Sequence, residues 1–394
     1  MRPTFDTLAV HAGREDLAEL GVHAPPLDFS TTNPIHDPAA AGASLEAMAL
    51  GGTPQGSAVY ARLHNPTVAR FENALAQLEG AAHAVAFGSG MAALSAVLLA
   101  AQQLRGKHVV AVRPLYGGSD HLLASGLLGA EVSWAEPATI SQHVRPDTAL
   151  VIVETPANPT LDLIDIEDVV RQARGVPVLV DSTFATPVLQ QPLRHGATLV
   201  LHSATKYLGG HGDVLAGVVA TSDEAWTAAL RQVRVITGAV LHPLGGYLLH
   251  RGLQTLAIRV RTAQAGAREI ARFLADHPAI ESVHYPELPG GDPKGLLGRQ
   301  MAGPGGMLAF VLKGGYPAAA RLMQSVRLCT PAVSLGSVDT LIQHPASLTH
   351  RVVDPAARES HGITAGLVRI SVGIEDPADI RADLARALDR VQSA

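Results

Sequence analysis

The stretch VLVDSTFATPVLQQPLRHGATLVLHSATK, residues 178–206, contains two short apolar runs that each end in polar residues. The first run, Val178–Val180, leads directly into Asp181. The second run, Thr198–Leu201, leads into a segment that ends at Lys206. One strand–helix–strand crossover separates the two runs, so the stretch predicts parallel strands whose carboxyl ends carry an acid and a lysine at one edge of a sheet.

Similar apolar runs lie on both sides of this stretch, with helical spacers between them. They are Ala84–Phe87, Val109–Val112, Leu150–Val153 and, less regular, Val214–Ala220. Short apolar runs that alternate with helices are typical of a largely parallel, doubly wound sheet covered on both faces. We therefore predict an α/β fold with a large domain that spans residues 61–248.

The two ends of the chain have a different character. Residues 1–60 are rich in Gly, Pro, Ala and Thr with little periodicity, and we expect them to form an extended arm. Residues 251–277 predict one long helix. Strand-like runs at Met307–Leu312 and Leu367–Val372 follow, and then a final amphipathic helix. These elements predict a smaller C-terminal α/β domain over residues 249–394.

Composition narrows the class of protein. The 394 residues are 47% hydrophobic and 16% charged, which favours a well-packed globular chain over a disordered one. A net charge of −5 predicts no strong attraction to nucleic acid or to anionic membranes. Cys329 is the only cysteine and the histidines lack a metal-ligand spacing, so we expect no disulfide and no metal. Without an apolar signal segment or an apolar run of membrane length, the chain is expected to be soluble and cytoplasmic.

The predicted strand ends gather the groups that pyridoxal 5′-phosphate (PLP) requires. Lys206 can form a Schiff base with the PLP aldehyde. Asp181 can keep the pyridine nitrogen protonated, so that the ring acts as an electron sink. Ser203 and Thr205 offer hydroxyls to the phosphate, and Asn158 can hydrogen-bond the ring hydroxyl. We therefore predict an enzyme that carries PLP on Lys206 and acts on an amino acid.

The turn FGSGMAA, residues 87–93, fits the same interpretation as a phosphate cup. Its glycines allow a close approach of the backbone, and the helix that follows presents free N–H groups. A rival interpretation is the dinucleotide fingerprint GxGxxA, for which Arg113 after the next strand would suit NADP. That interpretation gives no role to Asp181 or Lys206, so we rank it well below the PLP site.

With these motifs in place, the sequence resembles the Cys/Met-metabolism PLP enzymes. This family includes cystathionine γ-synthase, cystathionine γ-lyase, cystathionine β-lyase and methionine γ-lyase. The motifs that carry the resemblance run in order from about residue 60 to 376: YARLHNPT, FGSGMAA, LYGGS, ETPANPT, VDSTFATP, HSATKYLGGHGD, AVSLGS, QHPASLTH and GLVRISVGIED. The resemblance implies a fold-type I, aspartate-aminotransferase-like architecture and a homotetramer built of tight dimers.

The resemblance also implies roles for individual residues. Tyr116 would stack on the PLP ring and serve in proton transfer. Arg369 would hold the substrate α-carboxylate with its planar fork, and Ser334 would help to position the substrate near Lys206. The residues implied for the phosphate are Tyr60 and Arg62, which would reach the neighbouring subunit, the backbone N–H groups of Gly90 and Met91, and the hydroxyls of Ser203 and Thr205.

Departures from the family motifs bear on the substrate. Members that act on cystathionine typically carry an acid where Val59 stands, a glutamate where Val333 stands and often an arginine where His121 stands. Val59 and Val333 would instead form an apolar pocket for a thioether methyl or an acyl group. Against methionine, Gly118 stands where methionine γ-lyases usually carry a cysteine, and Val235 stands where they usually carry an aspartate.

The combined features predict a C–S lyase that performs α,γ-elimination on L-methionine or a related γ-substituted amino acid. The products would be a thiol, ammonia and 2-oxobutanoate. Two alternatives stay open: cleavage of cystathionine, and γ-replacement on an O-acylated homoserine. A PLP-fold protein without catalysis is disfavoured, because the lysine, the aspartate and the arginine are all present.

Overall fold

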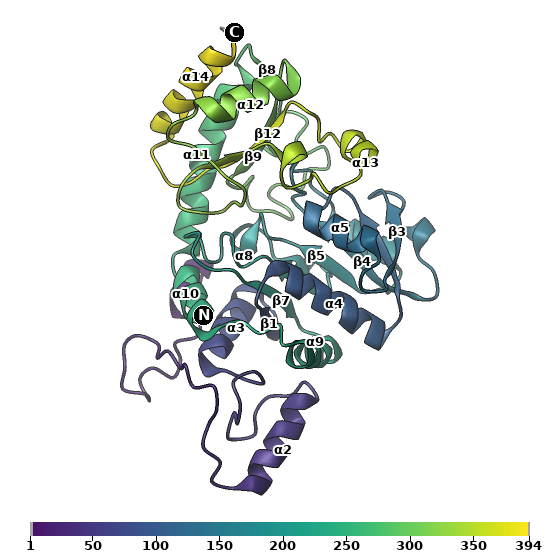
Figure 1. Cartoon of the computed structure of the whole chain (residues 1–394), viewed down its shortest axis with the longest axis vertical. Helices are drawn as coiled ribbons and strands as arrows, with labels where there is room; N and C mark the ends of the chain where they lie inside the picture. Colours follow the sequence, from purple (N-terminus) through teal and green to yellow (C-terminus); the bar gives the residue numbers. More distant parts are fainter. Residues whose placement is uncertain (1–2, 393–394) are drawn as a thin grey trace.

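The computed structural model describes residues 3–392, and a seven-stranded sheet lies at its centre (Figure 1). The strand order is β1-β7-β6-β5-β4-β2-β3. The strands are β1 (His83–Phe87), β2 (His108–Val112), β3 (Glu131–Ala135), β4 (Thr148–Glu154), β5 (Val178–Asp181), β6 (Leu199–His202) and β7 (Gly217–Thr221). Strands β2 to β6 pair in parallel, whereas β7 is antiparallel to both of its neighbours. The predicted α/β fold with a largely parallel sheet is confirmed.

Helices cover both faces of this sheet because successive residues of each strand point to opposite sides. In β5, Leu179 belongs to the apolar cluster around α4 (Gly90–Leu104) and α9 (Glu224–Thr237). Its neighbours Val178 and Val180 belong to the cluster around α7 (Ile166–Ala173). A strand that is buried on both faces has the continuous apolar pattern that the sequence showed.

A second sheet of five strands has the order β10-β11-β12-β9-β8. Its strands are β8 (Ile280–His284), β9 (Met307–Leu312), β10 (Thr330–Pro331), β11 (Leu341–Gln343) and β12 (Leu367–Ser371). It is mainly antiparallel, with only the short β10–β11 pair parallel. The helices α11 (Leu256–Ala275), α12 (Gly315–Ser325) and α14 (Pro377–Gln392) lie beside it (Figure 1). A second, smaller α/β unit toward the C-terminus is therefore present.

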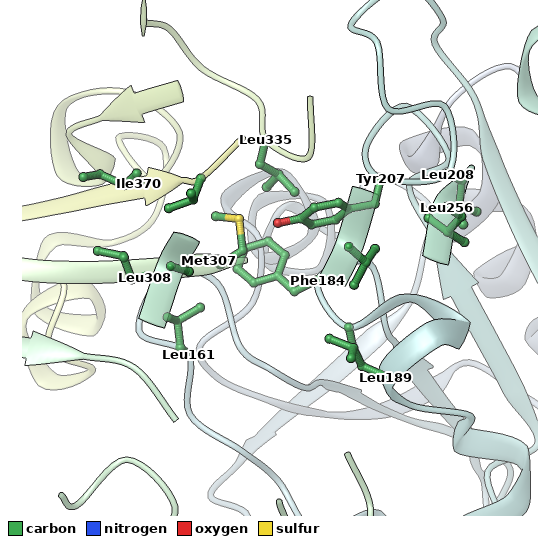
Figure 2. Close-up of a cluster of buried hydrophobic side chains, with 14 of the residues drawn as sticks. Leu161, Phe184, Leu189, Tyr207, Leu208, Leu256, Met307, Leu308, Leu335 and Ile370 are labelled. Atoms are coloured by element: carbon green, nitrogen blue, oxygen red, sulfur yellow. The ribbon is translucent and has the colours of Figure 1, made fainter. Parts of the chain in front are cut away.

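One apolar core joins the two sheets (Figure 2). Phe184 comes from the segment after β5, and Tyr207 comes from the segment after β6. Both are buried in the same cluster as Met307, Leu308 and Ile370 of the smaller sheet. The carboxyl ends of the central strands therefore face the smaller sheet across a packed, apolar boundary. The predicted domain limit near residue 248 falls inside α10 (Pro243–Leu253) and stays a prediction.

The sequence predicted an extended arm over the first sixty residues, but this segment is not simply extended. They contain two helices, α1 (Phe5–His11) and α2 (Pro38–Ala49). The start of α2 is set by Pro38 in its first turn and by Asp37, whose carboxylate accepts hydrogen bonds from two N–H groups. The alanine-rich sequence of α2 lacks a clear apolar stripe, so periodicity could not reveal it.

The long helix predicted over residues 251–277 is divided. Helix α10 ends at Leu253, and α11 begins at Leu256. Arg259 stabilises the break, because it donates hydrogen bonds of 2.6 Å to the carbonyl of Gly252 and 2.7 Å to that of Tyr207. The carbonyls at a helix end need such donors, and a guanidinium supplies several at once.

Most of the remaining helices are short, and the longest of them, α3, packs against the central sheet. They are α3 (Pro66–Glu79), α5 (Gly117–Ser125), α6 (Ile140–His143), α8 (Thr186–Leu189) and α13 (Pro355–Ser360), with 3₁₀ turns at Pro192–His195 and Pro345–Ser347. Over residues 3–392, no helix combines the length and the apolar character that crossing a bilayer would need.

Candidate active site

Lys206 follows strand β6, and its amine lies against a loop of the smaller sheet. Its Nζ donates a hydrogen bond of 2.6 Å to Oγ of Ser334. The carbonyl oxygen of Ser334 accepts a hydrogen bond of 2.8 Å from Nη2 of Arg369. The backbone φ of Ser334 is +85°, in the left-handed region that residues with a side chain rarely adopt. A strained residue therefore connects the lysine with the arginine.

The surroundings of Lys206 change the acidity of its amine. Burial, together with the positive charge of Arg369, lowers the pKa of Lys206 from 10.5 to about 8. An amine with this pKa is partly neutral near pH 7, and only the neutral form is a nucleophile or a base. Lys206 thus has the properties of a reactive lysine rather than those of a solvated one.

Asp181 ends strand β5 and is held by Thr183. The N–H and the hydroxyl of Thr183 donate to Oδ1 of Asp181 at 3.0 and 2.5 Å. Burial raises the pKa of Asp181, and the hydrogen bonds from Thr183 act in the opposite direction. Within residues 3–392, Oδ2 of Asp181 accepts no hydrogen bond, so this oxygen is available to a cationic N–H donor.

Arg369 lies on strand β12 and is almost completely buried, with 2% of its surface exposed. Its Nη1 donates a hydrogen bond of 2.8 Å to Oδ1 of Asn158. Gln343 is its register partner on β11, and with its amide oxygen toward the guanidinium it accepts from Nη2 at 2.7 Å. Burial lowers the pKa of Arg369 to about 10, so the side chain stays cationic at neutral pH. The arginine is therefore fixed in direction by three acceptors, including the Ser334 carbonyl.

Tyr116 precedes α5, and its side chain is 39% exposed. Its backbone N–H donates a hydrogen bond of 2.8 Å to Oε2 of Glu154. Nearby, Arg113 binds Asp120 at 2.5 Å, and its guanidinium carbon lies 3.6 Å from the ring centre of Trp134. The segment that carries Tyr116 is thus anchored from both sides, while the ring itself reaches open space.

The start of α4 forms a cup for an anion. Ser89 caps the helix by accepting a hydrogen bond of 3.0 Å from the N–H of Ala92. The N–H groups of Gly90 and Met91 donate to no acceptor within residues 3–392. A Cβ added at Gly90 would lie 3.1 Å from Oγ of Ser203, a tight contact, so glycine favours the close approach of these two segments. Free N–H groups at a helix N-terminus beside a hydroxyl are suited to a phosphate.

Comparison with known proteins agrees with this arrangement. The family model for the Cys/Met metabolism PLP-dependent enzymes matches residues 6–389. An L-methionine gamma-lyase of Brevibacterium sandarakinum is 59% identical over 391 residues, which cover 99% of this chain and 98% of the relative. The chain belongs to the Cys/Met metabolism PLP-dependent enzymes.

Solved structures of this family superpose closely on the chain. A cystathionine gamma synthase from Xanthomonas oryzae pv. oryzae, in complex with aminoacrylate and cysteine, gives a TM-score of 0.91 at 34% identity and covers 100% of both chains. Apo CalE6, a methionine gamma lyase from Micromonospora echinospora, gives a TM-score of 0.85 at 40% identity and covers 98% of this chain and 99% of that one. The aspartate-aminotransferase-like fold expected from the sequence is thereby confirmed.

The residues at the strand ends fit the cofactor of a Cys/Met metabolism PLP-dependent enzyme. The free N–H groups of Gly90 and Met91 suit its phosphate, the free Oδ2 of Asp181 suits a protonated ring nitrogen, and the amine of Lys206 suits its aldehyde. Thr205 is less free than Ser203, because its Oγ1 already bonds the N–H and the carbonyl of Ala216 at 3.0 and 3.1 Å.

Family resemblance assigns Tyr60 and Arg62 to a neighbouring PLP site, and in their own chain Arg62 contacts the end of α9. Arg62 donates a hydrogen bond of 2.7 Å to the carbonyl of Val235, and its guanidinium lies 5.6 Å from the ring centre of Tyr60. Tyr60 is 43% exposed. Their contribution to a partner subunit's site stays a prediction.

The predicted apolar pocket of Val59 and Val333 does not form within one chain. Val59 is buried in a small core where the arm, through Met48, packs against Leu63 and Val235. Val333 is 53% exposed and lines a cavity of about 600 Å³ beside Ser334. The role of the two valines in binding a substrate stays a prediction.

Two positions of the site could not be recognised from single motifs. Glu154 ends strand β4, just as Asp181 ends β5, and the two are register partners. Glu154 follows a buried run and opens the motif ETPANPT, but neither signal gave it a role. Gln343 opens the motif QHPASLTH, but only strand pairing brings it beside Arg369, and the sequence carries no local signal for that pairing.

Gly118 is the position at which the Tyr116 ring leaves no room for a side chain. A Cβ there would lie 2.6 Å from Cε1 of Tyr116 and 3.2 Å from the sulfur of Met91. We expect Gly118→Ala to move the ring by roughly 1 Å and to lower kcat by about tenfold or more. The melting temperature should stay within roughly 2 °C, because alanine favours the helix that begins here. An unchanged kcat would mean that the ring position is not critical.

Proposed function

We propose that this protein is a PLP-dependent C–S lyase that catalyses α,γ-elimination of L-methionine or a related γ-substituted amino acid. The observation that carries the proposal is the contact series from Lys206 through Ser334 to Arg369. It places a reactive amine and a cationic fork on two sides of the same residue, Ser334. The methionine γ-lyase relatives support the choice of substrate.

The cofactor would be held by residues that the site already orients. Lys206 would hold its aldehyde carbon, Asp181 its ring nitrogen and Asn158 its ring hydroxyl. Its phosphate would be held by the N–H groups of Gly90 and Met91 and by the hydroxyls of Ser203 and Thr205. When bound, PLP supplies the electron sink that makes the Cα proton of the substrate acidic.

The chain's own residues would carry the proton transfers. Arg369 binds the substrate carboxylate and fixes Cα near the amine of Lys206. The neutral Lys206 amine removes the Cα proton and can later return a proton to the carbon skeleton. Tyr116, whose phenol reaches open space, protonates the departing sulfur. With one water molecule consumed, which supplies the keto oxygen, the products are a thiol, ammonia and 2-oxobutanoate.

A second candidate is transsulfuration, that is, cystathionine cleavage or γ-replacement on an O-acylated homoserine. The close superposition with a cystathionine gamma synthase favours it. The measurement that separates the candidates is kcat/KM for 2-oxobutanoate release from L-methionine and from L-cystathionine, with O-acetylhomoserine plus a thiol in parallel. Preference for methionine supports the elimination, and preference for cystathionine or for replacement assigns the enzyme to transsulfuration.

We further propose a homotetramer of tight dimers with shared active sites. The arm that carries α2 extends from the body of the chain (Figure 1) and ends near Tyr60 and Arg62. Apolar side chains beside the site are exposed in the single chain, including Leu215 at 72% and Ile236 at 74%. Such side chains are suited to burial against another copy. A cytoplasmic location also stays a prediction.

The acidity of Lys206 predicts how the apoenzyme takes up PLP. Below its pKa of about 8 the amine is protonated and cannot attack the aldehyde. The rate of PLP incorporation should therefore rise about tenfold per pH unit below this value and level off above it. Stopped-flow absorbance between about pH 6.5 and 9.5 measures the rate. A rate that keeps rising to the end of this range would indicate an ordinary, solvated lysine.

A further inference from the structure

Glu154 is a buried carboxylate with no role in the proposed mechanism. It is 4% exposed, and each of its oxygens accepts a hydrogen bond from a different backbone N–H. Oε2 accepts from Tyr116 at 2.8 Å, and Oε1 accepts from Asn158 at 2.9 Å. Its position directly after a buried strand fixes the carboxylate, so both partners are held from one rigid point.

The two partners of Glu154 belong to different parts of the site. Tyr116 carries the phenol assigned to proton transfer. The side chain of Asn158 accepts a hydrogen bond of 2.8 Å from Nη1 of Arg369, which is assigned to the substrate carboxylate. We propose that Glu154 is a positioning residue that fixes Tyr116 and Arg369 relative to each other. The inference rests on the roles that the proposed function gives to these two residues.

The electrostatic surroundings of Glu154 disfavour the ionised form of its carboxylate. Burial raises the pKa of Glu154 well above its usual value, and the negative charge of Asp181 on the next strand raises it further. The N–H groups of Tyr116 and Asn158 and the charge of Arg369 act against this. A neutral acceptor would hold one backbone N–H with less electrostatic cost. A carboxylate can accept one N–H group on each of its two oxygens, as Glu154 does.

The variant Glu154→Gln tests this role because it changes one oxygen for an NH₂ group. The amide can accept from only one of the two N–H groups and confronts the other with a donor. We expect exchange of the Cα proton of L-norleucine with deuterium, followed by NMR, to fall by about 100-fold. L-Norleucine has no leaving group, so exchange reports proton removal without elimination. We also expect its dissociation constant, measured from the cofactor absorbance, to rise about tenfold.

Two further variants separate positioning from stability and from charge. Asp383 is a buried carboxylate outside the site that accepts N–H groups from Arg327, Leu328 and Cys329 at 2.8–3.0 Å. Asp383→Asn should lower the melting temperature but leave norleucine exchange unchanged. Glu154→Asp keeps the charge and shortens the side chain, so it should impair exchange about as much as Glu154→Gln. If Glu154→Gln does not fold, norleucine exchange and affinity in Glu154→Asp alone test the positioning role.

These experiments distinguish a failure of the positioning role from a failure of the proposed function. Wild-type rates of exchange and wild-type norleucine affinity in a folded Glu154 variant would overturn the positioning role. Wild-type exchange in Glu154→Asp with loss in Glu154→Gln would also overturn it, because charge rather than geometry would then matter. If the wild-type enzyme exchanges the Cα proton but does not release 2-oxobutanoate from methionine, the proposed substrate fails while the role of Glu154 can still be judged.

Discussion

Replacing Lys206 by alanine should lower kcat/KM for 2-oxobutanoate release by about 10⁴-fold or more. It should also abolish the near-visible absorbance of the Schiff base between PLP and the protein. Within residues 3–392 the amine of Lys206 is the one that bonds Ser334, and the proposed function gives it both the cofactor aldehyde and the Cα proton. General base catalysis alone contributes about 10²- to 10⁴-fold, and loss of cofactor attachment adds to this. Absorbance of the purified variant with added PLP and steady-state kinetics give the two readouts.

Lys313→Ala is the matched control for this variant. Lys313 is exposed and donates a hydrogen bond of 2.7 Å to the carbonyl of Pro278. It lies far along the chain from the central-sheet strand ends that carry Asp181 and Lys206. Its removal should leave both the absorbance and kcat/KM unchanged. Retention of the cofactor absorbance and of turnover in the Lys206→Ala protein would refute the central assignment of the site.

Replacing Arg369 by leucine should lower kcat/KM for L-methionine by about 10²- to 10⁴-fold, which is the range for removing one partner of a buried charge pair. The loss should appear mainly in KM, because the guanidinium holds the carboxylate before and after proton removal. A second readout is discrimination between L-methionine and L-methioninol, which lacks the carboxylate. This discrimination should nearly vanish in the variant, as measured from the binding of each to the holoenzyme.

Arg369→Lys is the informative companion variant. It keeps a positive charge but cannot reach Asn158, the Ser334 carbonyl and a substrate carboxylate together, because an ammonium lacks the planar fork. We expect it to remain at least about tenfold impaired. Full activity of the lysine variant would show that charge alone binds the carboxylate, and that the fixed direction of the guanidinium is unimportant.

The parts of the fold that could be predicted are those with strong local signals. The buried runs that become β4, β5 and β6 are apolar at nearly every position, and the polar residues after them are necessarily at one edge of a parallel sheet. The positions of Asp181 and Lys206 at this edge could therefore be predicted from the amino-acid sequence alone. The break between α10 and α11 could not be predicted, because it depends on Arg259, whose partners at Tyr207 and Gly252 are set by tertiary packing.

The same distinction holds within the site. Glu154 and Gln343 contact other protein groups, and these contacts depend on strand register and on backbone N–H directions, which the motifs that contain the two residues do not reveal. Val59 is a different case. The sequence suggested an apolar substrate pocket there, whereas within one chain this side chain packs in a small core with Leu63 and Val235, so its place in a substrate pocket stays a prediction. Sequence patterns identify reactive groups more readily than the groups that orient them.

The loop between β10 and β11 carries two adjacent residues that we expect to differ in how well they tolerate substitution. Ser334 is bound at its hydroxyl by the lysine and at its carbonyl by the arginine, in a backbone conformation that few residues tolerate. The adjacent Val333 is half-exposed toward the cavity. For directed evolution, we therefore expect a library at Val333 to change which γ-substituent is accepted while the chemistry is kept, whereas position 334 should be left untouched.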